Sequence, residues 1–425
     1  MFIQSIQIIN FRSVGSLETT LDGRLNVFVG MNGAGKSTIL DAAAILLSWL
    51  ANRIKTAGAS GRQIKISDIQ NGTPHAALSA TLNDAHTTVD WGLVKARAGI
   101  LKKIGVAGFT DLSEKAKQIQ AKITESDGNT NLPLLAYYPV HRAVLDIPLR
   151  IRNRHSFSIL ETYDESLTSG ANFRTFFEWF RNQEDFENEN RKYVNAGEHP
   201  EYFAFPDKQL EAVRNALSVF MPHFKNWTVR RRPLQMEVEK DGQALIVNQL
   251  SDGEKCLMAL VGDIARRMAI ANPLLDNPLH GEGIVLIDEI DLHLHPLWQR
   301  MMISRLLETF PNCQFLISTH SPHVLTHVQP QNVFILRTDD GKFTCEHPQE
   351  SYGKTSERIL EDLMGLGTTR PTGVTEALKA LFVRINNGEL EQAKNDIELL
   401  QQTIGADPEL VKAGVLIKRK ELIGK

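Results

Sequence analysis

Hydrophobic and polar positions alternate at the start of the chain, and a glycine-rich segment then leads into a long apolar stretch. Residues 2–9 alternate in the pattern of a β-strand, and the apolar run at 25–29 indicates a second strand that ends at a glycine. From Lys36 onward, apolar residues recur with helical spacing and cover so much of the helix surface that burial on most sides is expected. The chain therefore opens with a strand, a glycine loop and a helix.

The middle of the chain predicts shorter strands and a helical segment rich in aromatic residues. Alternation at 77–82 and 89–94 and an apolar run at 132–138 indicate strands, with a polar helix near 112–123. Residues 145–225 predict a compact helical subdomain without the sustained heptads of a coiled coil. Its core is expected to contain aromatic side chains, namely Phe173, Phe176, Phe177, Trp179, Phe180, Phe186 and Tyr193.

A second series of strands and helices follows the aromatic segment. Residues 234–238 and 243–247 predict a hairpin, because an Asp-Gly pair lies between them. A helix, a strand, a helix and two strands are then expected at 254–271, 283–288, 296–310, 314–318 and 332–336. Residues 354–425 are helix-rich and are interrupted by glycine and proline. Helices and strands therefore mix throughout, which indicates an α/β protein with a helical tail.

Composition places the chain among ordinary globular proteins. Hydrophobic residues make up 42% and charged residues 23% of its 425 residues. The apolar stretches fall short of the roughly 20 residues that span a bilayer. The N-terminus also lacks the basic region and apolar core of a secretory signal. We therefore expect a cytoplasmic protein without membrane contact. The three cysteines have no CxxC spacing, which argues against a zinc site or a disulfide framework.

The net charge of −3 argues against a globally basic nucleic-acid binder. Local basic groups are weaker candidates for nucleic-acid contact, because such groups are more often solvated surface. These groups are Arg150, Arg152, Arg154 and His155; Arg230, Arg231 and Arg232; and Lys418, Arg419, Lys420 and Lys425.

The strongest chemical signal is the segment GMNGAGKS at residues 30–37, between the second strand and the first helix. It fits the GxxxxGK[ST] pattern of the Walker A motif, in which backbone N–H groups and a helix N-terminus surround a phosphate. Lys36 is expected to reach the β- and γ-phosphates of a nucleotide, and the hydroxyl of Ser37 is expected to coordinate Mg²⁺. The sequence therefore predicts a nucleotide-binding loop.

An apolar strand that ends in two acids, IVLIDE at residues 284–289, fits a Walker B strand of a buried parallel sheet. Ligands of open α/β sheets bind at the edge where such strands end. Asp288 is therefore expected to hold Mg²⁺, and Glu289 to orient and activate the water that attacks the nucleotide.

Two further segments stand in the order that ABC-type ATPases show. LSDGEK at residues 250–255 begins a predicted helix with Ser251 as its N-cap, and it is similar to the ABC signature motif. FLISTH at 315–320 is a short strand that ends in His320, the place of the switch histidine. With both Walker motifs, these segments resemble ABC-type AAA ATPases of the RecF, SMC and OLD group, including the AAA-15/AAA-21 type.

The resemblance implies an α/β P-loop ATPase head with a mixed sheet, a helical subdomain and a helical C-terminal tail. The two halves of the head would be residues 1–144 and 233–340. The helical subdomain would occupy 145–232, and residues 341–425 would serve partner binding or oligomerisation. The cofactors would be ATP and Mg²⁺. The protein would form a head-to-head dimer or a higher oligomer, in which the signature of one subunit faces the γ-phosphate held by the other.

The resemblance also assigns roles to individual residues. The catalytic residues would be Glu289, His320 and Lys36, and Ser37 and Asp288 would hold the metal. The nucleotide-binding residues would be Arg12, Asn32, Gly33, Gly35, Lys36, Ser37, Thr38, Ser251, Gly253 and Glu254. Arg12 matches the N-terminal arginine by which RecF-like proteins approach the nucleotide, through stacking or phosphate contact.

Two loops need separate interpretation. Asp291, His293 and His295 could suggest a metal site, but their segment resembles the D-loop that crosses to the other subunit. We therefore expect it to form a dimer contact. The glutamine of a conventional Q-loop is not evident, because proline, histidine and arginine follow the apolar run that ends at Tyr138.

Residues 340–425, at the C-terminal end, help to distinguish the subfamilies of the RecF, SMC and OLD group. No DxD pair follows a strand in residues 340–425, so the Toprim nuclease of OLD proteins is not expected. The segments at 352–364, 370–371 and 407–410 are similar to the tail of the Septu antiphage ATPase subunit (PtuA), which also occurs with some retrons. This resemblance implies a regulatory ATPase with a separate PtuB-like HNH endonuclease as partner, and DNA or retron RNA/DNA as a further ligand. A RecF-like repair ATPase that binds gapped DNA is the alternative.

Overall fold

The computed structural model describes residues 1–84, 87–97, 108–142, 158–168, 170, 172–195, 205–339 and 342–423. The chain divides into two compact units, Met1–Thr355 and Ser356–Lys425. The basic group at Arg150, Arg152, Arg154 and His155, and Lys425, lie outside the described residues. Within those residues, no helix is long and apolar enough to cross a membrane.

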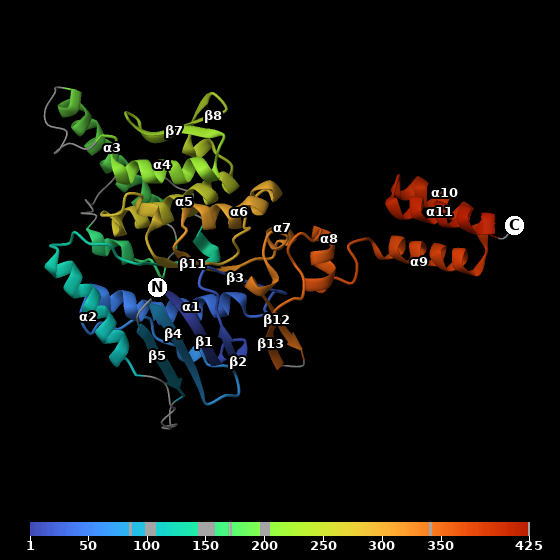
Figure 1. Cartoon of the computed structure of the whole chain (residues 1–425), viewed down its shortest axis with the longest axis horizontal. Coiled ribbons are helices and arrows are strands. Elements are labelled where there is room, and N and C mark those ends of the chain that lie inside the picture. The colour runs from blue at the N-terminus through green and yellow to red at the C-terminus, as the bar shows by residue number, and fades with distance from the viewer. Residues whose placement is uncertain are drawn as a thin grey trace. The chain divides into compact units, whose positions relative to one another are not determined.

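Two sheets organise the larger unit (Figure 1). The antiparallel sheet, in the order β2-β1-β4-β5, consists of β2 (Val14–Thr20), β1 (Phe2–Phe11), β4 (His75–Asp84) and β5 (Thr87–Ala96). The mixed sheet, in the order β13-β12-β3-β11-β10-β6, consists of β13 (Lys342–Glu346), β12 (Val333–Asp339), β3 (Leu25–Gly30), β11 (Cys313–Ser318), β10 (Gly283–Ile287) and β6 (Leu134–Tyr138). All neighbours in the mixed sheet are parallel except β12 and β13. The loops that follow β3, β6, β10 and β11 therefore emerge at one edge.

Helix α1 (Lys36–Lys55) contacts strands of both sheets. Apolar residues surround it, and almost all of its side chains are buried, as its broad apolar face predicts. Helix α2 (Thr110–Glu125) packs against α1 and β5. The buried apolar side chains of α1 and of both sheets form one continuous core. This core fixes the start of α1, and with it the glycine loop, against the edge of the mixed sheet.

Three helices and a small sheet form a further part of the larger unit. The helices are α3 (Phe173–Asn195), α4 (Lys208–Phe220) and α5 (Asp252–Ala271). The sheet consists of β7 (Phe224–Arg231), β8 (Leu234–Lys240) and β9 (Gln243–Ile246). The expected hairpin is β8-β9, and Asp241 and Gly242 in its turn have φ of 49° and 82°. Strand β7 lies in the segment expected to be helical, so the sequence-based boundary at residue 232 falls inside this sheet.

The aromatic residues of α3 are buried only in its first half. Phe173, Phe176, Phe177, Trp179 and Phe180 are buried, as predicted. The prediction is wrong for Phe186 and Tyr193, which are 52% and 37% exposed.

Acidic side chains take the inward positions in the second half of α3. Glu184 and Glu187 are buried there, and they pair with Arg231 at 2.5 Å and Arg214 at 2.9 Å. Arg231 also pairs with Asp185, and Arg230 pairs with Glu237 at 3.4 Å. Ion pairs therefore replace aromatic packing here, and they occupy most of the basic group expected at 230–232.

The remaining helices of the larger unit connect these parts. The remaining α-helices of the larger unit are α6 (Pro296–Thr309) and α7 (Pro322–Leu325). The 3-10 helices are η1 (Ile66–Asp68), η2 (Val140–Arg142), η3 (Ile159–Tyr163), η4 (Val247–Gln249), η5 (Pro278–His280) and η6 (Pro330–Asn332).

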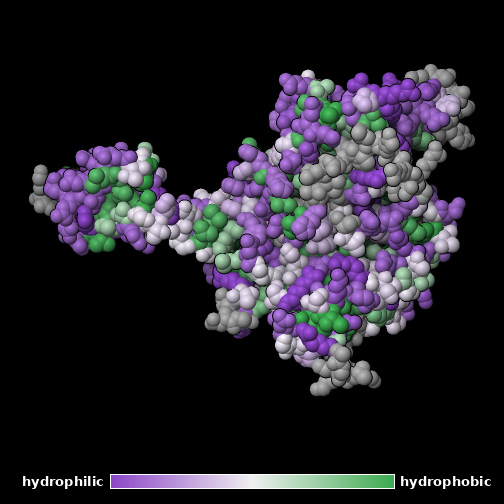
Figure 2. Space-filling view, turned by 180° about the vertical axis from the view of Figure 1, so that it is seen from behind, coloured by the Kyte–Doolittle hydropathy of each residue, from purple (hydrophilic) through white to green (hydrophobic). Residues whose placement is uncertain are grey.

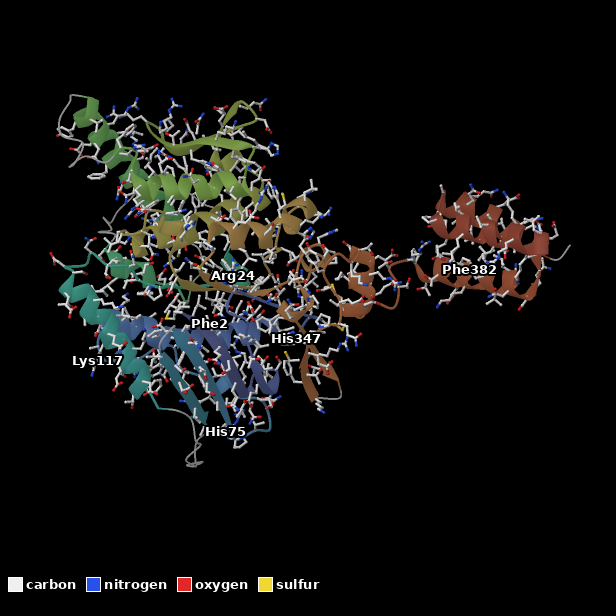
Figure 3. The ribbon with its side chains drawn as sticks, viewed as in Figure 1. Phe2, Arg24, His75, Lys117, His347 and Phe382 are labelled. Carbon is white, nitrogen blue, oxygen red and sulfur yellow. The ribbon has the colours of Figure 1, made fainter. Side chains whose placement is uncertain are left out.

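The smaller unit begins with α8 (Ser356–Arg358) and the π-helical turn η7 (Ile359–Leu363). Helices α9 (Thr372–Asn387), α10 (Leu390–Ile404) and α11 (Pro408–Ile423) follow and share a separate apolar core. Phe382, labelled in Figure 3, packs against this core from α9. Figure 2 shows hydrophobic side chains on the surface of this unit among hydrophilic ones. The exposed apolar residues of its three long helices are Val383, Leu399, Val411, Val415 and Leu422.

Candidate functional site

The glycine loop at residues 30–37 joins β3 to α1 at the edge where the parallel strands end. Gly33 and Gly35 have φ of 82° and 96°, values that residues with side chains rarely adopt. An added Cβ on Gly30 would lie 2.4 Å from the carbonyl oxygen of Leu336 on β12. The loop therefore requires glycine at these three positions.

Lys36 folds over its own loop. Its Nζ donates hydrogen bonds to the carbonyl oxygens of Gly30, at 2.9 Å, and Met31, at 3.0 Å. Burial lowers the pKa of Lys36, and the negative charges of Asp288, Glu289 and Asp291 oppose this shift only in part. The ammonium therefore lies in the field of three carboxylates from the loop that follows β10.

The other predicted loop residues differ in exposure. Asn32 is exposed at the tip of the loop, and Ser37 is exposed in the first turn of α1. Thr38 is buried, and its hydroxyl lies 3.4 Å from the hydroxyl of Ser13. Ser37 is thus accessible to a ligand, whereas Thr38 contacts the turn between β1 and β2.

The two acids that follow β10 are held from the neighbouring strand β11. The hydroxyl of Ser318 donates to the carboxylate of Asp288 and accepts the backbone N–H of Glu289 at 2.8 Å. Glu289 adopts a φ of 47°, which is uncommon for a residue with a side chain. Ser318 therefore holds the carboxylate of Asp288 and the backbone of Glu289, although the sequence did not single it out. Its position at the end of a strand predicted to lie parallel to β10 could have indicated that it reaches the two acids after β10.

Asp291 connects the loop after β10 to the segment after β11. Its carboxylate accepts the hydroxyl of Thr319 at 2.5 Å and the backbone N–H of His320 at 3.3 Å. Burial and the charge of Lys36 lower the pKa of His320, and the nearby carboxylates only partly oppose them. His320 therefore carries a neutral imidazole at neutral pH.

The neighbouring histidines have other surroundings. His293 is exposed, and the Nδ1 of His295 accepts the backbone N–H of Leu297 at 3.3 Å as the N-cap of α6. In the part of the chain that the structure describes, no three His, Cys, Asp or Glu side chains gather to hold a metal ion.

Ser251 caps α5, as expected from the sequence. Its hydroxyl accepts the backbone N–H of Glu254 at 3.4 Å. The carboxylate of Glu254 accepts the N–H of Ser251 at 2.8 Å and the ammonium of Lys240 at 2.7 Å. Burial raises the pKa of Glu254, but these partners outweigh it and the pKa is lowered. Glu254 therefore braces the helix start, and a nucleotide contact through its carboxylate would require these bonds to be exchanged.

Gly253 lies directly against the loop after β10. An added Cβ at this position would lie 2.3 Å from the carbonyl oxygen of His293. The hydrogen bonds that the side chains of Ser251 and Glu254 make remain within residues 240–254. The described structure thus brings the signature next to the predicted D-loop.

Arg12 is fixed beside the start of α1. Its guanidinium pairs with Asp41 at 2.6 Å and Asp68 at 2.9 Å, and Arg62 pairs with Asp41 at 2.6 Å. Burial lowers the pKa of Arg12, but the two carboxylates outweigh it and the pKa is raised. Burial, followed by the charges of Asp288 and Asp41, raises the pKa of Tyr137. The Arg12 cluster and the acids after β10 therefore both act on Tyr137.

Comparison with known proteins agrees with this arrangement. The AAA_23 family model, described as an AAA domain, matches residues 5–218. The AAA_21 model matches residues 134–326, and its description names an AAA domain with the AbiEii toxin and type IV toxin–antitoxin systems.

Curated relatives extend over most of the chain. The retron Ec83 probable ATPase of Escherichia coli is 31% identical, over 87% of this chain and 77% of that protein. The Septu protein PtuA of Bacillus thuringiensis is 23% identical, over 89% of this chain and 88% of that protein. Among solved structures, the SMC head domain from Thermotoga maritima has 14% identity and a TM-score of 0.43, over 82% of this chain and 100% of that chain.

Proposed function

This chain belongs to the AAA-domain ATPase family that includes the retron Ec83 probable ATPase, and we propose that it is the regulatory ATPase of an antiphage defence system. ATP hydrolysis is the activity of this family. One observation carries the site assignment: Lys36, Asp288, Glu289 and His320 gather at the edge where the parallel strands end. This grouping supports a site for phosphoryl transfer to water.

Each residue has a defined part in the proposed reaction. Lys36 would exchange its loop carbonyls for the β- and γ-phosphates. The hydroxyl of Ser37 and the carboxylate of Asp288 supply the oxygen ligands that Mg²⁺ prefers, and the ion would neutralise phosphate charge when bound. Glu289 would take a proton from the attacking water, and neutral His320 would hold that water or the γ-phosphate.

The site is proposed to be completed by a second copy of the chain. Gly253 at the start of α5 lies against the loop that carries His293, which resembles the D-loop expected to cross to the other subunit. In a head-to-head dimer, the start of α5 would present its N–H groups to the γ-phosphate bound by the partner. Arg12, beside the start of its own α1, would approach the nucleotide of its own subunit after giving up one of its two carboxylates.

The partner is proposed to be a small PtuB-like HNH endonuclease, with DNA or retron RNA/DNA as a further ligand. The similarity to the Septu protein PtuA supports this proposal. Residues 356–425 form a separate compact unit with exposed apolar side chains on its long helices. Such a unit supports a role in partner binding or oligomerisation.

Co-expression with the neighbouring open reading frame is expected to yield a stable complex with a small HNH protein. Native mass spectrometry of the purified material would measure its stoichiometry, and removal of residues 356–425 is expected to release the nuclease. A bare dimer that binds gapped DNA, with the steep salt dependence of phosphate contacts, would favour the RecF-like alternative. Robust metal-dependent DNA cleavage by the purified chain alone would contradict a separate effector.

The pH dependence of hydrolysis is expected to reflect His320. Because burial and Lys36 lower its pKa below the ordinary 6.5, the neutral imidazole persists above that pH and is lost only as the pH falls through the lowered pKa. The His320 contribution to kcat/KM should therefore be constant above pH 7 and decline below pH 6.5. Profiles of wild type and His320→Gln isolate this contribution, and a His320-dependent decline centred above pH 6.5 would disprove the assignment.

A further inference from the structure

A buried hydrogen-bond network joins the acidic edge of the site to helix α5. The hydroxyl of Tyr138, the last residue of β6, donates to Oδ2 of Asp263 on α5 at 2.9 Å. The backbone carbonyl of Tyr138 also accepts the N–H of Asp288 at 2.9 Å. A single fully buried tyrosine therefore contacts the proposed metal-holding residue through its main chain and the signature helix through its side chain.

Asp263 is fixed by charged partners. Its carboxylate accepts hydrogen bonds from Arg266 and Arg267, each at 2.7 Å. Arg267 also donates a hydrogen bond to the carbonyl oxygen of Thr162 at 2.7 Å. Burial raises the pKa of Asp263, but Arg267 and Arg266 outweigh it and the pKa is lowered. Asp263 is therefore an anion whose hydrogen-bond partners include Tyr138. Buried polar networks with satisfied partners hold their members in one geometry.

We propose that Tyr138 is a positioning residue that transmits the state of the nucleotide site to the signature helix. A displacement of Asp288 when nucleotide binds would move the end of β6 through the backbone hydrogen bond. The Tyr138 hydroxyl would then move Asp263, and helix α5 would carry this movement to Ser251 and Gly253. From residue 253 to residue 263 the distance along the helix is about 15 Å at 1.5 Å per residue.

The position of Tyr138 suits this role because it lies where a conventional Q-loop would begin. The sequence offers no glutamine there, and the side chain that reaches the signature helix belongs to the strand itself. The inference rests on the proposed two-subunit ATP site, because the movement of α5 has an effect only if the signature contacts a partner's nucleotide.

Tyr163 provides a matched control for the loss of a buried hydroxyl. It is also a buried tyrosine, and its hydroxyl donates to the carbonyl oxygen of Pro133 at 2.8 Å instead of to a side chain of α5. Tyr163→Phe therefore removes the same atom and a bond of similar length, and it leaves Asp263 with all of its partners.

The test compares full-length wild type, Tyr138→Phe and Tyr163→Phe. Tyr138→Phe is expected to bind ATP with an unchanged Kd, but to lose about tenfold in both kcat and ATP-dependent dimerisation, the size of effect seen within coupling networks. Tyr163→Phe should keep both, although its melting temperature also falls because a buried hydrogen bond is lost. An unchanged Kd for ATP together with a lowered kcat would not be expected if Tyr138 contributed only to the stability of the fold.

The possible failures can be told apart. If wild type does not dimerise with ATP, the proposed two-subunit site is wrong. If wild type does so and Tyr138→Phe matches it in kcat and dimerisation, only the role of Tyr138 is wrong. Equal losses in both phenylalanine variants would also overturn it, because they would reduce the effect to a general loss of buried hydrogen bonding.

Discussion

Replacing Glu289 with glutamine is expected to lower kcat for ATP hydrolysis by about 10²–10⁴-fold, the contribution typical of a positioned general base. Glutamine has the same shape but cannot take a proton from water. The backbone at this position is held by Ser318 through the N–H of residue 289, which the substitution leaves in place. The Kd for ATP should therefore remain within about threefold of wild type, because the lost interaction belongs to the transition state.

A dimer joined by ATP should accumulate in this variant. ATP that is not hydrolysed remains bound between two subunits, so Glu289→Gln is expected to be a stable dimer in the presence of ATP and Mg²⁺. Light scattering after gel filtration measures the mass of this dimer. Wild type should return to its resting state as ATP is consumed. Glu308→Gln is the control, because Glu308 is an exposed glutamate on α6. Hydrolysis at the wild-type rate by Glu289→Gln would show that another group activates the water.

Lys36→Ala is expected to abolish ATP binding at millimolar nucleotide. The ammonium lies in the field of Asp288, Glu289 and Asp291, so its removal leaves three carboxylates facing a polyanionic ligand. Hydrogen bonds between charged groups contribute about 1.5–3 kcal/mol each, and two lost phosphate contacts would raise the Kd by about 10²-fold or more. Titration with a fluorescent ATP analogue measures this change.

The matched control lies at the other end of the same helix. Lys55 is partly exposed in the last turn of α1 and pairs with Asp164. Lys55→Ala removes the same charge from α1 but should leave the Kd for ATP unchanged. An unaltered Kd in Lys36→Ala, with the far-ultraviolet circular dichroism of wild type, would exclude the proposed phosphate contact.

Local signals were sufficient to predict the central elements. The apolar run before Gly30 became β3, the helical spacing from Lys36 became α1, and the apolar run before Asp288 became β10. These elements are buried on most sides, so their residues show little interruption by polar positions. The glycine pattern also depends on backbone conformation within a few residues, which sequence reports directly.

Strands with neither a continuous apolar run nor a clear alternation were missed. Residues 14–20 of β2 are mostly polar or small, and only Val14 and Leu17 are buried. In β7, the pairing with β8 shifts register between Lys225 and Thr228, and this irregularity breaks the alternation that would reveal a strand. The weakly buried edge strand β13 gave no apolar signal either.

The residues that support the site could not be found from spacing, because their partners are distant in the sequence. Ser318 reaches Glu289 across 29 residues, Arg62 reaches Asp41 across 21, and Tyr138 reaches Asp263 across 125. The same cause explains Phe186. Its exposure follows from Glu184 and Glu187, whose arginine partners lie on other elements. Motif order predicts which residues meet the ligand, but it does not predict which residues hold them.

The position of β3 in the mixed sheet has a consequence for biosynthesis. Of the strands of the mixed sheet, β3 is synthesised first. Both of its neighbours, β11 and β12, come from the last third of the chain, and Leu25 pairs with Phe315. At a translation rate of roughly 5–20 residues per second, about 15–60 s separate the synthesis of these two residues. During that interval, β3 has been synthesised but neither of its partner strands in the mixed sheet has. We therefore expect nucleotide binding only from the nearly finished polypeptide, and none from an N-terminal fragment that is released early.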